Sequence, residues 1–136
     1  MKARSKRGSG ITESVVAAIV LIPLALCLID LMALVVCNSM NDTLVKNMAR
    51  AAANQTESGA GFAAAENARQ SFKPSPLVGS IDLEAFEWPP DGTQDPAVTV
   101  KTRMVVHMPV PFPYFGDSVQ FVAQDVEPIV AQTATP

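Results

Sequence analysis

The sequence contains few of the residues that build catalytic or metal sites, with one histidine and two cysteines among its 136 residues. His107 has no second histidine or external thiol that could complete a metal site with it. Asp91 and Asp95 flank a glycine, but the ligand spacing and terminal glutamate of an EF-hand are missing, which indicates a turn. The sequence therefore predicts no enzyme, no cofactor and no metal site.

Cysteine is absent from everything after residue 37, which excludes disulfides from that part of the chain. Cys27 and Cys37 both lie in a long apolar segment. On one helix they would be about 15 Å apart, which is too far for a disulfide. We interpret both as small apolar residues that face lipid or another helix.

Basic residues are scarce after the first eight positions. The leader through Gly8 holds four of the ten Lys and Arg residues and no acidic residue, so the remainder has six against thirteen, a net charge of −7. Phosphate binding needs a basic face, and this acidic remainder therefore argues against nucleic acid as a partner. Nothing in the composition indicates a small-molecule substrate.

The longest apolar run extends from Val15 to Cys37, 23 residues interrupted only by Pro23 and Asp30. A helix of this length covers about 35 Å, enough to cross a hydrocarbon core of about 30 Å. It is too long for the apolar core of an ordinary secretory signal, which has about 7 to 15 residues. The basic leader places the N-terminus in the cytoplasm, so that residues after about position 38 are outside.

A basic leader, a glycine and a glutamate precede this run in a characteristic order. The basic residues end just before Gly8, and Glu13 stands at the start of the apolar run. If the chain is cut between Gly8 and Ser9, Glu13 becomes the fifth residue of the mature chain. This arrangement resembles the class III leader of type IV pilin-like proteins. The resemblance implies a prepilin peptidase that cuts after Gly8 and a hydrophobic helix that is retained for assembly.

Within that class the chain is similar to the TadE-like pseudopilins, or minor pilins, of the tight-adherence (Tad, Flp-type) pilus system. The late acidic residue Asp30, the alanine-rich residues 49–53 and a β-type tail carry this resemblance. It implies a single-pass protein of the inner (cytoplasmic) membrane with an external, periplasmic domain. The implied partners are the membrane, the peptidase and other pilin or pseudopilin subunits, with Glu13 and Asp30 as assembly residues.

Asp30 is costly within a membrane span, by about 2.5 to 3.5 kcal/mol on insertion scales. Such residues usually face protein. Two interpretations are open for it: a polar contact with another span, or a side chain that snorkels or is neutralised near the outer boundary.

Helical periodicity continues after the span. Met40, Leu44, Val45, Met48, Ala51 and Ala52 form one apolar stripe, whereas polar residues, Asn41 among them, mostly occupy the other faces. This pattern fits either one continuous helix over about 12–54, the stalk of a pilin-like protein, or a separate juxtamembrane helix. Residues 1–10 are expected to be disordered or bound to the peptidase. A break is expected at 58–61, followed by a short helix over 62–72 that ends before Pro74.

Prolines become frequent from Pro74 onward and predict strands punctuated by turns. The clearest strand covers 97–110, where alternate residues from Val98 to Val110 are mostly apolar. Strands are also expected over 80–88 and 118–126, with a turn at 89–92 and a loop over 109–116. Three antiparallel strands packed on a helix are the simplest assembly. The aromatic residues from Phe112 to Phe115 either cover the core or form an exposed binding patch.

The sequence thus predicts a membrane α+β protein, with one N-terminal transmembrane helix extended into a stalk and a small antiparallel β-sheet domain. Its divisions are a cytoplasmic leader over 1–8, the transmembrane and stalk helix over 9–54 and the external domain over 55–136. The expected function is a structural component of a Tad-type pilus. The alternative is a generic signal-anchored envelope protein whose external β domain binds an unrelated partner.

Overall fold

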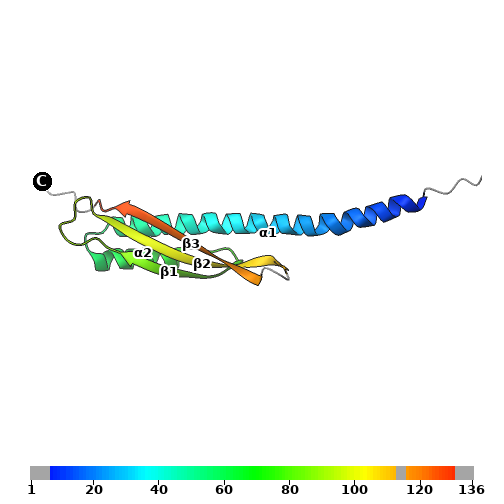
Figure 1. Ribbon diagram of the computed structural model, residues 1–136. Helices are drawn as coiled ribbons and strands as arrows, with labels where there is room; N and C mark the ends of the chain where they lie inside the picture. Colours follow the sequence, from blue (N-terminus) through cyan, green and yellow to red (C-terminus); the bar gives the residue numbers. More distant parts are fainter. Residues whose placement is uncertain (1–6, 113–115, 131–136) are drawn as a thin grey trace, which may run out of the picture.

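The computed structural model describes residues 7–112 and 116–130. Its elements are two helices, α1 (Arg7–Ala53) and α2 (Ser58–Ser71), followed by three strands, β1 (Val78–Glu87), β2 (Ala97–Phe112) and β3 (Gly116–Pro128). Helix α1 extends far beyond the sheet, and only its C-terminal half lies beside the other elements (Figure 1). This is the predicted arrangement of a long apolar helix followed by a small antiparallel β-sheet domain.

Helix α1 is continuous over 47 residues and includes Pro23. The interpretation as one unbroken helix is therefore confirmed over the separate juxtamembrane helix. Its start differs from the prediction, because it begins at Arg7 rather than near Thr12 and takes in Gly8 and Ser9. Near the other end, Ser58 to Gly61 do not form the expected break. They belong to α2, and residues 54–57 separate the two helices.

The three strands form one antiparallel sheet in the order β1-β2-β3. The alternation predicted for 97–110 is confirmed, since Val98, Val100, Met104 and Val106 are buried whereas Arg103 and His107 are exposed. Lys101 and Arg103 lie on the outer face and form ion pairs with Glu84 on β1, at 3.4 and 2.6 Å. The hydrogen bond from Arg103 lowers the pKa of the Glu84 carboxyl.

Strand β2 is longer than expected. The proline-containing residues 109–112, predicted to be loop, belong to it, and β3 begins at Gly116. The predicted loop does correspond to irregular pairing, because the register between β2 and β3 shifts between His107 and Phe112. Pro113 to Phe115 and the side chains of residues 111–115 lie outside the described part, and with them the predicted role of the aromatic residues.

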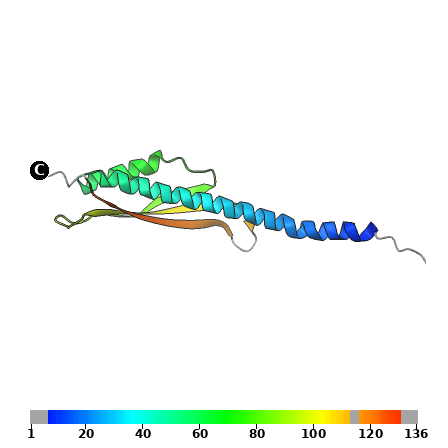
Figure 2. The same cartoon turned by 90° about the horizontal axis from the view of Figure 1, so that it is seen from above.

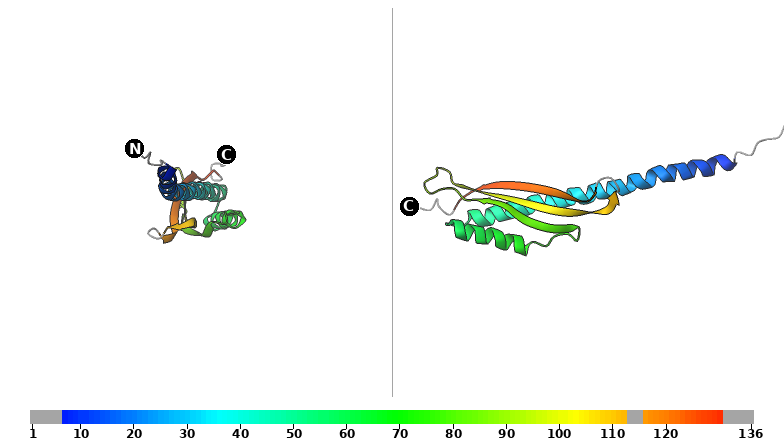
Figure 3. Two further views of the ribbon diagram at one scale, coloured as in Figure 1. Left: turned by 90° about the vertical axis from the view of Figure 1, so that its right-hand side faces the viewer. Right: turned by 60° about the horizontal axis from the view of Figure 1, so that its bottom comes forward.

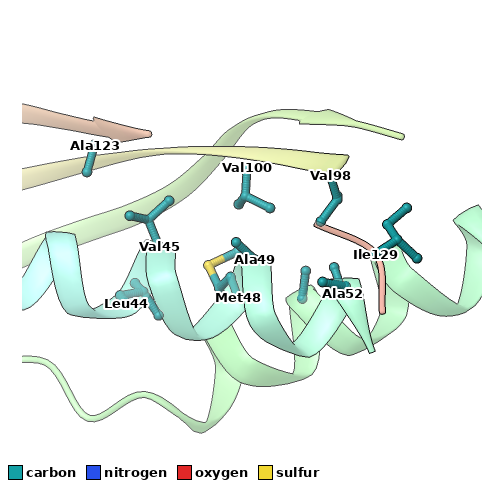
Figure 4. Packing of buried hydrophobic residues seen from close by; sticks show 11 residues of the cluster. Leu44, Val45, Met48, Ala49, Ala52, Val98, Val100, Ala123 and Ile129 are labelled. Atoms are coloured by element: carbon teal, nitrogen blue, oxygen red, sulfur yellow. The ribbon is translucent and has the colours of Figure 1, made fainter. Parts of the chain in front are cut away.

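Both helices cover the same face of the sheet (Figure 3). The main core joins α1, α2 and the sheet, as Figure 4 shows for its buried side chains. Helix α1 contributes a stripe of residues to this core: Leu44, Val45, Met48, Ala49, Ala52 and Ala53. The predicted domain boundary at residue 54 therefore lies between the sheet and a helix that forms part of the same core.

Helix α2 packs against the sheet through a glycine. A Cβ atom added at Gly61 would lie 2.5 Å from Cζ3 of Trp88, whereas one added at Gly59 would have no atom within 4 Å. The Trp88 ring in turn stacks on Phe86, with ring centroids 6.3 Å apart. Gly61 therefore allows close packing against Trp88, and the prediction that it breaks the helix is wrong.

Two glycine substitutions in α2 are expected to change stability in opposite directions. Gly61→Ala should destabilise the domain by about 1 to 3 kcal/mol, because Trp88 must move from its packed position. Gly59→Ala should stabilise it by up to about 1 kcal/mol through helix propensity alone. Urea unfolding of the detergent-solubilised full chain, followed by Trp88 fluorescence, measures both. Equal effects of the two changes would contradict the packing role of Gly61.

Candidate functional site on the long helix

The N-terminal half of α1 is the part of the molecule with no packing partner in this chain. Nearly every side chain from residue 10 to residue 29 is exposed, including Ile19, Val20 and Ile22 at 60 to 65%. By length and composition, α1 is the one helix in the described residues that fits a membrane span. An apolar surface on all sides of a helix is suited to lipid or to the apolar helices of other subunits.

The predicted cleavage and assembly residues lie along this segment. Gly8 and Ser9 are within the first turn of α1, and Glu13 follows in the second turn with an exposed side chain. The side chain of residue 13 is therefore accessible at the surface of the projecting half. Asp30 lies at the other end of the exposed segment, and its surroundings are very different.

Asp30 is buried, with 3% of its surface exposed. Its Oδ1 atom accepts a hydrogen bond of 3.0 Å from the backbone N–H of Val110 on β2. The partner of Asp30 in the structure is therefore the protein's own sheet, a contact that neither sequence interpretation included. Its Oδ2 atom is buried without a hydrogen-bond partner among the described residues.

After Asp30, one face of α1 packs on the sheet and the opposite face is exposed. Cys37 is buried against Met104 and Val106 of β2, so it faces the sheet and not lipid or another helix. Cys27, in contrast, is exposed on the projecting half. The face of α1 away from the sheet stays apolar and open through Leu31, Met32, Val35 and Val36. This open apolar face extends the exposed surface of the projecting half past the level of Asp30.

A buried polar pair fixes α1 on the sheet one turn after Cys37. The Thr102 hydroxyl donates a 3.0 Å hydrogen bond to Oδ1 of Asn41, and Nδ2 of Asn41 donates to the carbonyl of Phe121 at 3.4 Å. Both side chains are completely buried. The expectation that Asn41 lies on a face other than the apolar stripe is wrong here, because it is buried and β2 and β3 supply its partners. The alternation along β2 could have indicated this contact, because Thr102 is in phase with Val100 and Met104, which face the core.

A concave region also lies between α2 and β1. Its volume is about 690 Å³, and its lining includes Phe62, Glu66, Arg69 and Phe86. Arg69 forms an ion pair with Glu66 and donates a 2.9 Å hydrogen bond to the carbonyl of Ile81. The hydrogen bond from Arg69 lowers the pKa of Glu66 to about 2. The hydrogen bond from Arg69 to Ile81 therefore links α2 to β1, whereas the ion pair with Glu66 lies within α2.

The described residues hold no cluster of three or more His, Cys, Asp or Glu side chains that could bind a metal ion. His107 lies on the outer face of the sheet, where its ring packs over Gly79. Comparison with protein-family models, curated proteins and solved structures gave no match. The function is therefore inferred from the residues of this chain and their geometry.

Proposed function

We propose that the protein is a pilin-like, membrane-anchored assembly subunit, a TadE-like minor pilin or pseudopilin of a Tad-type pilus. The observation that carries this proposal is the division of one continuous helix. Its N-terminal half is apolar and exposed on all sides, and its C-terminal half forms part of the core of a small sheet domain. Such a subunit can pack its free half beside other helices in the membrane while its domain stays outside.

The leader supports the same proposal. Basic residues precede Gly8, and Glu13 follows at the fifth position after it. This order resembles that of prepilin peptidase substrates. The role is structural rather than catalytic, with the inner membrane as its location and other pilin subunits as partners. A signal-anchored envelope protein with an unrelated partner is the competing function, and it differs in its mature N-terminus.

Processing between Gly8 and Ser9 is the first test. Intact-mass analysis of protein from native membranes is expected to show loss of residues 1–8, because the peptidase cuts after the glycine. Gly8→Val should abolish this loss, since a branched side chain replaces the glycine at the cut. Gly10→Val changes a glycine two residues past the cut and should still be processed.

An intact N-terminus, or a start beyond residue 37, would favour the signal-anchored alternative. Unchanged processing of the Gly8→Val variant would show that the cut lies elsewhere.

A further inference from the structure

The end of the sheet formed by β2 and β3 lies at the level where α1 leaves the domain. Strand β2 starts at Ala97, next to the C-terminal end of α1, and runs back along the helix towards its N-terminal half (Figure 2). The hydrogen bond between Val110 and Asp30 fixes this end of β2 on the helix. Beyond that bond, β2 continues to Phe112 and β3 begins at Gly116.

The depth of this point in a membrane follows from helix geometry. The twenty residues from 10 to 29, which precede Asp30, span about 30 Å, which equals the thickness of a hydrocarbon core. If Glu13 instead marks the inner boundary, Asp30 lies about 25 Å further out, within about 5 Å of the outer boundary. Either choice places Val110 at the outer surface of the hydrocarbon. The sheet end is then in the lipid headgroup layer and not in water.

The composition of this end fits that layer. From Met108 to Gly116 the sequence has no charged residue, and charge returns at Asp117. Pro109 and Pro111 have no backbone N–H, so two positions at the end of the strand have no donor that water would have to satisfy. The pairing with β3 is irregular between His107 and Phe112, and within this stretch the N–H of Val110 donates to Asp30.

The open apolar face of α1 continues past this depth. Met32 and Val35 are 73% and 68% exposed, although they follow Asp30 in the chain. These side chains lie about 3 to 7.5 Å past Asp30 along the helix, at the level of the headgroup layer rather than of the hydrocarbon. In water they would form an unpartnered apolar surface.

We propose that the β2–β3 end of the sheet is a second membrane contact, in which the uncharged strand end around Pro109 and Val110 lies in the outer headgroup layer. Its partner is the lipid bilayer itself, beside the span. Together with the Asp30 hydrogen bond, this contact sets the orientation of the external domain relative to the membrane. The inference depends on the membrane anchoring contained in the proposed function.

Site-directed fluorescence quenching of the full chain in phospholipid vesicles tests this inference. Cys27 is replaced by alanine, and Cys37 is kept because it is buried. A single new cysteine then carries an NBD fluorophore at Pro109→Cys, at Gln94→Cys in the exposed loop between β1 and β2, or at Val20→Cys in the span. The quenchers are iodide in water and nitroxides on the lipid acyl chain, one near the carbonyl end and one near the methyl end. Trp88 fluorescence checks that each variant is folded.

The Pro109 probe is expected to be quenched by the nitroxide near the carbonyl end and to lose most of its iodide quenching, whereas the Gln94 probe shows the reverse. The Val20 probe should be quenched by lipid only. If the Pro109 probe behaves like the Gln94 probe while the Val20 probe stays lipid-quenched, the second contact is wrong and the anchor stands. If the Val20 probe is open to iodide, both the anchor and the second contact are overturned.

Discussion

Val100→Asp is expected to unfold the sheet domain of this protein. Val100 is completely buried between the sheet and α1. The substitution removes about 1.5 to 3 kcal/mol of burial free energy. It also places an unpaired carboxylate in an apolar core, which costs several kcal/mol more and approaches the whole net stability of a small domain, about 5 to 15 kcal/mol.

The neighbouring substitution Lys101→Asp is the matched control. Lys101 lies on the outer face, and its ion pair with Glu84 is of the exposed kind that contributes about 0 to 1 kcal/mol. Thermal unfolding of the full-length chain in detergent, read by Trp88 fluorescence and by protease resistance of residues 58–130, compares the two variants. Similar tolerance of both would refute the assignment of the inward face of β2.

Glu13→Gln is expected to abolish co-purification with partner pilins and to leave membrane insertion and processing unchanged. After cleavage, the Ser9 ammonium has an unperturbed pKa of about 7.7 to 8.0 and is largely charged at neutral pH. A neighbouring subunit can bring its ammonium to the exposed Glu13 side chain at the same membrane depth. In a low-dielectric environment, leaving either charge unpaired costs far more than pairing both, so the pair favours one axial register.

Interaction with the helix dipole is the alternative role of Glu13. That effect contributes about 0.3 to 1 kcal/mol and decreases beyond the first turn, and residue 13 already lies in the second turn of α1. Glu57→Gln makes the same chemical change in the exposed link between α1 and α2 and should not affect assembly. Wild-type assembly of the Glu13→Gln variant would rule out the ion pair and leave the dipole role.

Local structure could be predicted from the sequence where a single periodicity of apolar residues determines it. Alternation along 97–110 predicted the two faces of β2, because successive side chains of a strand point to opposite sides. The stripe through Leu44, Val45 and Met48 predicted the buried face of α1, because residues three and four apart share a helix face. These two patterns, together with the length of the apolar run, determined the helix-plus-sheet architecture.

Two features depended on contacts between residues far apart in the chain. Gly61 resembles a helix breaker by residue type, but Trp88 packs against it from a later part of the chain. Asn41 is polar, and polar side chains usually face solvent, but its hydrogen-bond partner Thr102 is 61 positions away in the chain. Propensity describes a residue by its sequence neighbours, so it cannot report a partner that the tertiary fold supplies.

The sequence by itself determined that this chain has an apolar helix long enough to cross a membrane, a basic leader before it and a half-buried central strand. Only the tertiary structure decided where along α1 the free apolar surface ends, because lipid and a protein core both accept apolar side chains. The apolar run continues to Cys37, whereas the sheet already covers Asp30 and Cys37. The level on α1 at which the domain begins is set by where β2 contacts the helix, and that position depends on packing rather than on hydropathy.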